Sequence, residues 1–395
     1  MKTIQLLNPE YESRTGELQA FHSAKTVEAA GEFDANAESH GAICQGGDCE
    51  ATPADGSLPI PVCFARTTGT STRAWADRSL PSPVRFAWER VRDPSKTLVY
   101  DLVVSRDAEF KDPMVFKEIA SPCSNVVNLH IGTRYYWKVV GHDRESVLAV
   151  SSVGTFETHS STPRWLQVPG ISNVRDLGGW GLPGNQRIRQ GLAYRSSEMN
   201  GHLDIADEGA RVLIEDLKIR TDLDLRRSDE SPRSALDPAM VKWVNIPVEP
   251  YSDIFKNENR IRYRKIFAIF ADPSFYPILF HCYGGCDRGG TIAFLLQGLL
   301  GLDRDSMIRD YELSSLSIFG ERSCSSDSPS SRGFQSLLAA LQPFGDGEDD
   351  IGKQVENCIL SIGVTSEEIA SIRDHLTEKV GADDMRDAVS EERGD

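Results

Sequence analysis

The spacing of apolar residues along the chain changes at about residue 160. Between residues 82 and 157, apolar side chains alternate with polar ones in short runs, first in VRFAW (84–88) and again around 98–104 and 135–139. A period of two is typical of half-buried strands, and turn residues separate the runs. This part of the chain therefore predicts a small all-β sandwich.

After residue 160, short apolar runs alternate with helical patterns. We expect strands within 217–227, 241–248 and 276–282, and helices at 260–271 and 291–301. Such alternation predicts an α/β domain with a largely parallel central sheet flanked by helices. Thr365 and Glu368 have the spacing of a capping box, which predicts a helix over 366–376.

The length of 395 residues exceeds what one hydrophobic core usually organises, so we expect several parts. They are an N-terminal arm (1–58) that is partly loosely ordered, the β-sandwich (59–160), the α/β domain (161–380) and an acidic tail (381–395). Cys44 and Cys49 lie in the arm near His40, but their spacing does not match a zinc site. We interpret them as incidental thiols.

The net charge of −16 argues against binding to nucleic acid or to an anionic membrane surface, because both require a basic footprint. The first residues lack the apolar core of a secretory signal, and no apolar run reaches the length of a membrane span. We therefore expect a cytoplasmic protein without stable membrane insertion. Its eight cysteines are then expected to be thiols.

The candidate chemistry lies in HCYGGCDRGG (281–290), between a predicted strand and a predicted helix. Glycines there let backbone N–H groups turn toward an anion, and the start of a helix adds partial positive charge. The same environment favours a thiolate, so Cys282 is the candidate nucleophile. Arg288 is suited to grip two phosphate oxygens, and Asp287 to protonate the leaving group.

These roles predict two displacements through a phosphocysteine intermediate, without a metal or another cofactor. We expect His281 to support the loop by hydrogen bonding rather than to transfer a proton. The residues expected to surround the phosphate are Tyr283, Gly284, Gly285, Cys286, Asp287, Arg288 and Gly289.

The loop resembles the His-Cys-x-x-Gly-x-x-Arg signature of protein tyrosine phosphatases, in particular the bacterial atypical tyrosine/dual-specificity group. Further segments are similar to that group in the same order, so that the resemblance covers about 165–378: ISNVRDLGGW, GLAYRSSEMN, LKIRTDLDLRRSDE, MIRDYELSS and GVTSEEIASIR. The resemblance implies a cysteine phosphatase domain with Cys282 as nucleophile, Arg288 as phosphate clamp and Asp287 as general acid. It also implies a phosphotyrosine protein or a small phosphoester as substrate.

Two further expectations concern segments outside the loop. The strand pattern of 59–160 resembles fibronectin type III or immunoglobulin-like modules in general, which favours a structural platform or a surface for a protein partner. The family implies that Asn173, Arg175 and Asp176 pack near the active site, whereas an Arg-Asp pair before two glycines is typical of a structural turn. We prefer the turn.

The loop departs from the family pattern at two positions. Cys286 stands where the group commonly has lysine, which removes a cation and argues against phosphoinositides as substrates. Gly289 stands where a Ser or Thr normally stabilises the departing thiolate, so we expect slower breakdown of the phosphoenzyme. Thr291 does not replace that hydroxyl, because two helical residues correspond to about 200° around the axis. Cys286 either fills space or captures an oxidised Cys282.

Other hypotheses stay open. Within enzymes, the rival is a phosphatase for phosphoinositides, inositol phosphates or other small phosphoesters. From other classes, the rivals are a catalytically weak phosphate-binding module and a metal site that uses His281, Cys282 and Cys286. On the helix at 260–271, three basic residues either attract anionic substrate or form a solvated face: Arg260, Arg264 and Lys265.

Overall fold

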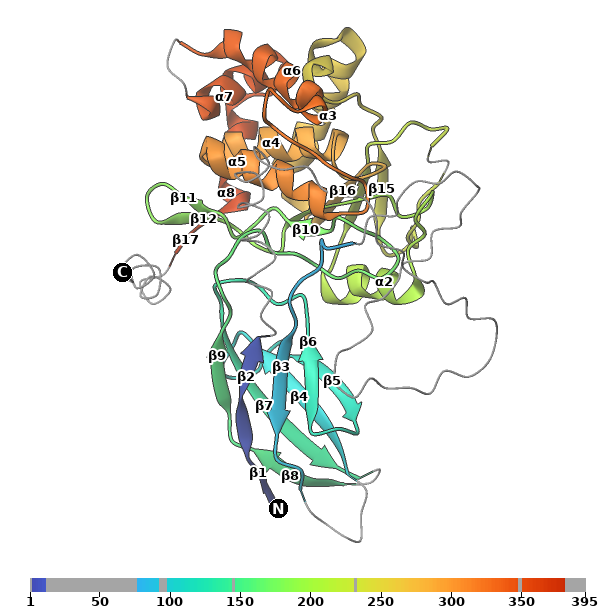
Figure 1. Cartoon of the computed structure of the whole chain (residues 1–395), viewed down its shortest axis with the longest axis vertical. Coiled ribbons are helices and arrows are strands. Elements are labelled where there is room, and N and C mark those ends of the chain that lie inside the picture. Colours follow the sequence, from blue (N-terminus) through green and yellow to red (C-terminus); the bar gives the residue numbers. More distant parts are fainter. Residues whose placement is uncertain are drawn as a thin grey trace, which may run out of the picture. The chain divides into compact units, whose positions relative to one another are not determined.

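The amino-terminal part of the fold consists of two β-sheets (Figure 1). The computed structural model describes residues 2–11, 77–91, 98–143, 146–230, 233–346 and 350–380. One sheet has the order β1-β8-β7-β4-β5 with β9 also paired to β7, and the other has the order β2-β3-β6. The strands are β1 (Lys2–Ile4), β2 (Leu6–Tyr11), β3 (Val84–Trp88), β4 (Val99–Ser105), β5 (Met114–Ile119), β6 (Cys123–Val126), β7 (Arg134–His142), β8 (Val147–Ser151) and β9 (Gly154–Glu157).

Both sheets contribute to one apolar core, as the alternation in the sequence predicts. In β3 and β7 every second side chain points into that core, and the intervening ones are more exposed. Large aromatic side chains pack edge to face across it, which adds to the stabilisation from buried area. The core residues of these two strands are Val84, Phe86, Trp88, Tyr135, Trp137 and Val139.

The strands begin earlier in the chain than the expected boundary at residue 58. β1 pairs with β8 and β2 pairs with β3, so residues 2–11 belong to the sheets and not to a separate arm. The rest of that arm lies outside the described residues, including His40, Cys44 and Cys49, and so does the acidic tail at 381–395.

The second part of the fold is built on a five-stranded sheet with the order β10-β13-β16-β14-β15. Four of its strands are parallel, and β10 is antiparallel to β13. The sheet is therefore mixed, and the expected parallel arrangement holds for its four longer strands. Their bounds are β10 (Arg175–Asp176), β13 (Ala193–Ser196), β14 (Thr221–Asp224), β15 (Lys242–Asn245) and β16 (Ile278–His281).

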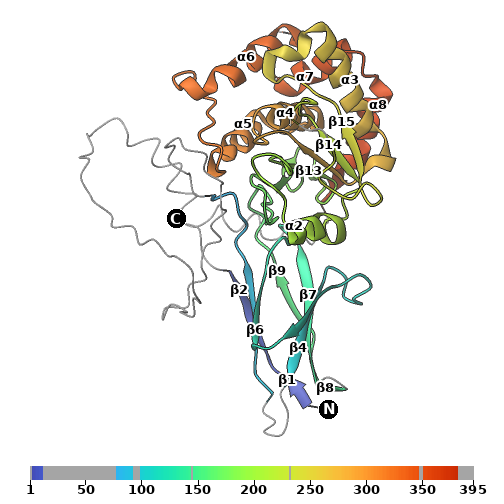
Figure 2. The same cartoon turned by 90° about the vertical axis from the view of Figure 1, so that its right-hand side faces the viewer.

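Helices lie on both faces of this sheet (Figure 2). In β16, Ile278 and Phe280 contribute to one core, and Leu279 contributes to another on the opposite face. The first core contains α3 (Asn257–Ala271), α4 (Arg288–Leu300), α6 (Arg332–Leu341), α7 (Ile351–Ser361) and α8 (Ser366–Leu376). The second contains α2 (Asp207–Arg211) and the π-helix η1 (Val212–Asp216).

The remaining elements complete this part of the chain. The capping box predicted for Thr365 and Glu368 is confirmed at the start of α8. No helix among the described ranges is long and apolar enough to span a bilayer. The other elements are a small sheet of β11 (Gly181–Leu182), β12 (Gln186–Ile188) and β17 (Thr377–Lys379), the helix α5 (Arg304–Glu312), and the 3₁₀ turns η2 (Tyr251–Phe255), η3 (Pro273–Phe275), η4 (Leu313–Leu316), η5 (Pro329–Ser331) and η6 (Gln342–Phe344).

Candidate active site

The signature loop, residues 282–288, connects the middle strand of the sheet to the start of α4. β16 lies between β13 and β14 and ends at His281, and α4 begins at Arg288. Cys282 is 2% exposed. A Cβ atom added to Gly289 would lie 4.0 Å from its Sγ, so the thiol faces the first turn of α4. The partial positive charge of that helix end is therefore placed where it stabilises a thiolate and a bound phosphate.

Two glycines allow the loop to pass close to neighbouring parts of the chain. Gly285 has a φ of 68°, and a Cβ atom there would lie 2.4 Å from the carbonyl oxygen of Ser196. A side chain at Gly284 would meet the ring of Phe319 at 3.0 Å. Residues with side chains would strain the backbone or displace these neighbours, so glycine is needed at both positions for steric reasons.

Arg288, the expected phosphate clamp, forms an ion pair with Glu230. Its Nη1 donates to Oε2 of Glu230 at 2.7 Å, and its Nη2 to Oε1 at 3.4 Å. The hydrogen bond from Arg288 is the main cause that lowers the pKa of Glu230. Burial opposes the charge on Arg288, but Glu230 and Cys282 raise its pKa. Glu230 thus orients a guanidinium that stays charged.

Asp287, the expected general acid, is held by groups from two other segments. Arg322 donates from Nε to Oδ1 at 3.1 Å and from Nη2 to Oδ2 at 3.2 Å. The hydroxyl of Tyr251 on η2 donates to Oδ1 as well, and it lies 2.8 Å from the hydroxyl of Tyr311 on α5. Burial and the charge of Asp287 raise the pKa of Tyr251, so this phenol stays protonated and acts as a donor.

Cys286 is fully buried. Its thiol donates to the carbonyl oxygen of Gly284 at 3.2 Å and accepts from Nδ2 of Asn173 at 3.4 Å. Burial raises the pKa of Cys286 to about 11. A thiol that stays protonated is a poor nucleophile, which favours the space-filling role over capture of an oxidised Cys282.

Asn173 braces the signature loop directly. It has a φ of 58°, donates from Nδ2 to the carbonyl oxygen of Gly284 at 3.0 Å, and receives a hydrogen bond from Arg175. Asp176 instead accepts from the backbone N–H of Gly178 at 2.8 Å, as in an Asx turn. The preferred interpretation as a structural turn describes Asp176 but is incomplete for Asn173 and Arg175.

A buried network of two arginines and one carboxylate supports the loop from behind. Arg175 and Arg195 each donate to Asp310 on α5 at 2.8 Å, and Arg195 also donates to the carbonyl oxygen of Gly285 at 2.6 Å. Burial and the nearby Arg195 lower the pKa of Arg175 to about 10. Burial alone would raise the pKa of Asp310, but the two guanidiniums outweigh it and keep the carboxylate ionised. Removal of any one of these three side chains would leave an uncompensated charge in the buried interior.

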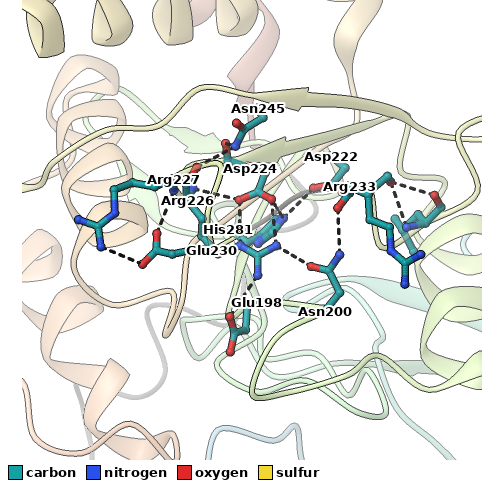
Figure 3. Close-up of polar contacts among 12 residues, drawn as sticks. Glu198, Asn200, Asp222, Asp224, Arg226, Arg227, Glu230, Arg233, Asn245 and His281 are labelled. Atoms are coloured by element: carbon teal, nitrogen blue, oxygen red, sulfur yellow. Dashed lines mark hydrogen bonds and ion pairs between the residues drawn. The ribbon is translucent and has the colours of Figure 1, made fainter.

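His281 lies in a second buried polar cluster beneath the loop (Figure 3). Its Nε2 is 2.9 Å from Oδ1 of Asp222 and 3.9 Å from Oδ2 of Asp224, and Arg226 is paired with both Asp224 and Glu198. Burial opposes protonation, but the two aspartates outweigh it and raise the pKa of His281. The ring thus faces carboxylates of the neighbouring strand β14. Among the described residues, neither ring nitrogen forms a hydrogen bond to the signature loop, so the supporting role stays a prediction.

An aromatic group lies beside the loop on its exposed side. Tyr283 is 38% exposed, and its ring meets the ring of His202 at a centroid distance of 4.8 Å and that of Phe319 at 5.6 Å. We call these three residues the aromatic rim. Its edge-to-face contacts hold the Tyr283 ring next to the candidate nucleophile.

The structure gives less support to two other hypotheses, substrate attraction by the basic residues of α3 and a metal site in the signature loop. Arg260 and Arg264 engage the carbonyl oxygens of Ser361 and Gly363, so these two side chains are committed to the helical layer. Among the described residues, no group of three or more His, Cys, Asp or Glu side chains is arranged to hold a metal ion.

Thr291 is engaged elsewhere. Its hydroxyl donates to the backbone carbonyl of Asp287 and accepts from the N–H of Tyr251. This agrees with the expectation that Thr291 does not replace the hydroxyl that Gly289 lacks.

No sequence pattern marks Glu230, Tyr251 or Arg322 as site residues, and none assigns a role to Arg195 or Asp310. Arg195, Glu230 and Asp310 lie in segments that carry the family resemblance, which was the available signal. Tyr251 and Arg322 lie outside those segments, and only the folded chain brings them to the loop.

A sequence model described as the tyrosine phosphatase family matches residues 166–378, which is more than half of the chain. The "Putative tyrosine-protein phosphatase" of Cupriavidus necator is 32% identical over 36% of this chain, which spans only 59% of that relative. Two structures of the Siw14 catalytic core were also found. The S. cerevisiae PP-IP phosphatase core in complex with citrate is 19% identical, covers 46% of this chain and 96% of that one, and has a TM-score of 0.29. The other is 21% identical, covers 42% and 88%, and has a TM-score of 0.28.

Proposed function

The chain belongs to the tyrosine phosphatase family, and we propose that it hydrolyses phosphate monoesters through a phosphocysteine intermediate at Cys282. The observation that carries this proposal is the position of Cys282, which is buried between the carboxyl end of β16 and the first turn of α4. Arg288 and Asp287 lie in the same loop. An anion bound there faces a helix amino terminus and a guanidinium.

The reaction takes place in two displacements. In the first, the Cys282 thiolate attacks phosphorus, an S–P bond forms, and the ester O–P bond breaks while Asp287 gives its proton to the leaving oxygen. In the second, water attacks phosphorus, Asp287 accepts a proton from that water, and the S–P bond breaks to release inorganic phosphate and the thiolate. Arg288 and the loop N–H groups stabilise the charge on the transferred phosphoryl group in both steps.

We further propose that the preferred substrates are aryl phosphates, with phosphotyrosine in proteins as the main class. Support comes from the aromatic rim of Tyr283, His202 and Phe319, which borders the loop and offers ring edges to a bound phenyl group. An alkyl phosphate would leave this surface in contact with water. The rim therefore favours an aromatic leaving group over a small sugar or inositol phosphate.

The test is hydrolysis of p-nitrophenyl phosphate and of a phosphotyrosine peptide by the wild type, Cys282→Ser and Cys123→Ser. Cys123 on β6 is a free, partly exposed cysteine outside the loop, so its variant controls for a general effect of thiol loss. We expect Cys282→Ser to abolish turnover and Cys123→Ser to leave it unchanged. Full activity of Cys282→Ser would refute the mechanism. Equal kcat/KM for phenyl phosphate and an alkyl phosphate of similar size would refute the aryl preference.

We also propose that the two amino-terminal sheets form an immunoglobulin-like sandwich domain, separate from the phosphatase domain that follows at about residue 161. Support comes from the two sheets that share one core. Calorimetry of the full chain tests this division. Phosphate should raise the melting temperature of one transition and leave another unchanged, whereas a single transition that shifts as a whole would contradict it.

A further inference from the structure

Arg322 is the group that most directly controls the candidate acid. Its side chain is 20% exposed, and it grips both carboxylate oxygens of Asp287, whose side chain is 42% exposed. A bidentate guanidinium stabilises the ionised carboxylate. The Tyr251 hydroxyl donates to the same carboxylate, and the Tyr311 hydroxyl and the Cys286 thiol lie nearby.

This arrangement conflicts with the task of a general acid. Asp287 must carry a proton when the ester bond breaks, yet both of its oxygens accept hydrogen bonds from a cation. A proton on either oxygen would weaken its contact with the guanidinium, so Arg322 and the role of general acid compete for the same two oxygens. Its Nη1 donates to the carbonyl oxygens of Phe319 and Glu321, so the backbone holds one side of the guanidinium while Nε and Nη2 face the carboxylate.

Two hydrogen bonds to Ser315 fix the backbone of Arg322 beside the signature loop. Its N–H donates to the hydroxyl of Ser315 at 2.8 Å, and that hydroxyl donates to its carbonyl at 2.9 Å. The charge of Arg322 also reaches Cys286, where it partly opposes the rise in pKa that burial causes. A cation from a distant segment thus stands next to the loop position at which the family commonly has lysine.

We propose that Arg322 selects substrates with a second anionic group beside the reacting phosphate, and that it releases Asp287 when it binds that group. The proposal rests on the proposed phosphatase function. The substrate anion takes over the guanidinium, and Asp287 takes up a proton from solvent for the leaving oxygen. Because the aromatic rim favours aryl phosphates, the class we assign is a phosphotyrosine peptide with an acidic residue next to the phosphotyrosine.

The experiment compares two phosphotyrosine peptides that differ only in Asp or Asn next to the phosphotyrosine. The enzymes are wild type, Arg322→Gln, Arg322→Lys and Arg262→Gln. Arg262 lies on α3 and pairs with Glu258, so it provides the same change of charge outside the site. We expect wild type and Arg262→Gln to favour the Asp peptide about tenfold in kcat/KM, as for one charge-assisted contact. Arg322→Gln should show no preference, and Arg322→Lys a reduced one.

The separate constants distinguish this role from a structural one. In the wild type, the Asp peptide should both lower KM and raise kcat, because it binds Arg322 and frees Asp287. In Arg322→Gln, Asp287 is already free, so kcat should be the same for the two peptides. Two results would overturn the inference and leave the phosphatase function standing. In one, Arg322→Gln still prefers the Asp peptide; in the other, the wild type hydrolyses both peptides equally through Cys282.

Two further outcomes are informative. In the first, the wild type prefers inositol bisphosphate to inositol monophosphate, the preference depends on Arg322, and the two peptides react equally. This result would overturn the assignment to peptides. A wild type inactive on every phosphate ester would overturn both proposals. If Arg322→Gln does not fold, Arg322→Lys still tests the inference, because it must lose part of the preference while p-nitrophenyl phosphate is still hydrolysed.

Discussion

A single hydroxyl placed at the start of α4 should accelerate the breakdown of the phosphoenzyme. In Gly289→Ser, the new Cβ would lie 4.0 Å from Sγ of Cys282, which is ordinary van der Waals contact. The hydroxyl on that carbon can reach hydrogen-bonding distance of the sulfur without a shift of the backbone. Serine is also at least as favourable as glycine in a helix, so the change should not harm stability.

The size of the effect follows from the charge that develops on sulfur. When water attacks the phosphocysteine, Cys282 leaves as a thiolate, and a donor to an ionised group contributes about 1.5–3 kcal/mol. If the transition state realises about half of this stabilisation, or about 0.75–1.5 kcal/mol, the rate constant of dephosphorylation rises about 4- to 13-fold, since 1.4 kcal/mol corresponds to a factor of ten. The first displacement, which consumes the thiolate, should change less.

Rapid mixing with p-nitrophenyl phosphate measures both steps. We expect the wild type to show a burst of nitrophenolate followed by slow turnover, because its second step is limiting. Gly289→Ser should show a smaller burst and a faster steady state. Gly289→Ala adds the same Cβ without the hydroxyl and serves as the matched control. A steady-state rate that is equal in the serine and alanine variants, or a linear progress curve for the wild type, would refute the reasoning.

Three other variants test the groups that support the loop. Asp310→Asn leaves two buried arginines unbalanced and should cost about 3–5 kcal/mol in chemical unfolding; Asp305→Asn, exposed on the same helix, should cost under about 0.5 kcal/mol. Because the pKa of Asp310 is lowered in the folded chain, its contribution is present at neutral pH and is lost as pH falls below about 4. Asn173→Ala should lower kcat about tenfold through loss of the loop contact, whereas Asn185→Ala, which also replaces a residue with positive φ, should not; equal activities would contradict the bracing role. Glu230→Gln should weaken inhibition by inorganic phosphate, since the clamp loses its orientation, and tighter inhibition would show that Glu230 competes with phosphate instead.

The predictable parts of the molecule are those that depend on short-range sequence. The alternation at Val84, Phe86 and Trp88 predicts a strand with one buried face. The continuous apolar run before His281 predicts a strand that is buried on both faces. The antiparallel strand β10 could not be foreseen, because a two-residue strand carries no periodic signal.

The contacts that control the charges of the site are long-range. Arg322 reaches Asp287 from 35 residues away, and Arg288 meets Glu230 across 58 residues. No spacing rule relates such positions, since only the packing of α4 against the sheet and its loops brings them together. The sequence therefore predicts which side chains carry the chemistry, but not which partners set their protonation and orientation.

The hydroxyl of Ser79 has a consequence for how the phosphatase part should be delimited. The backbone N–H of Asn173, the residue that braces the signature loop, donates to Oγ of Ser79 at 3.0 Å in a buried position. Ser79 lies 87 residues before the family match begins at residue 166. A fragment cut at the limits of that match would expose or orphan this N–H and lose a support of Gly284. One contact that supports the signature loop thus lies before both the family match and the phosphatase domain proposed from about residue 161. Loss of activity in a fragment cut at either limit would therefore indicate the loss of this contact and not an inactive enzyme.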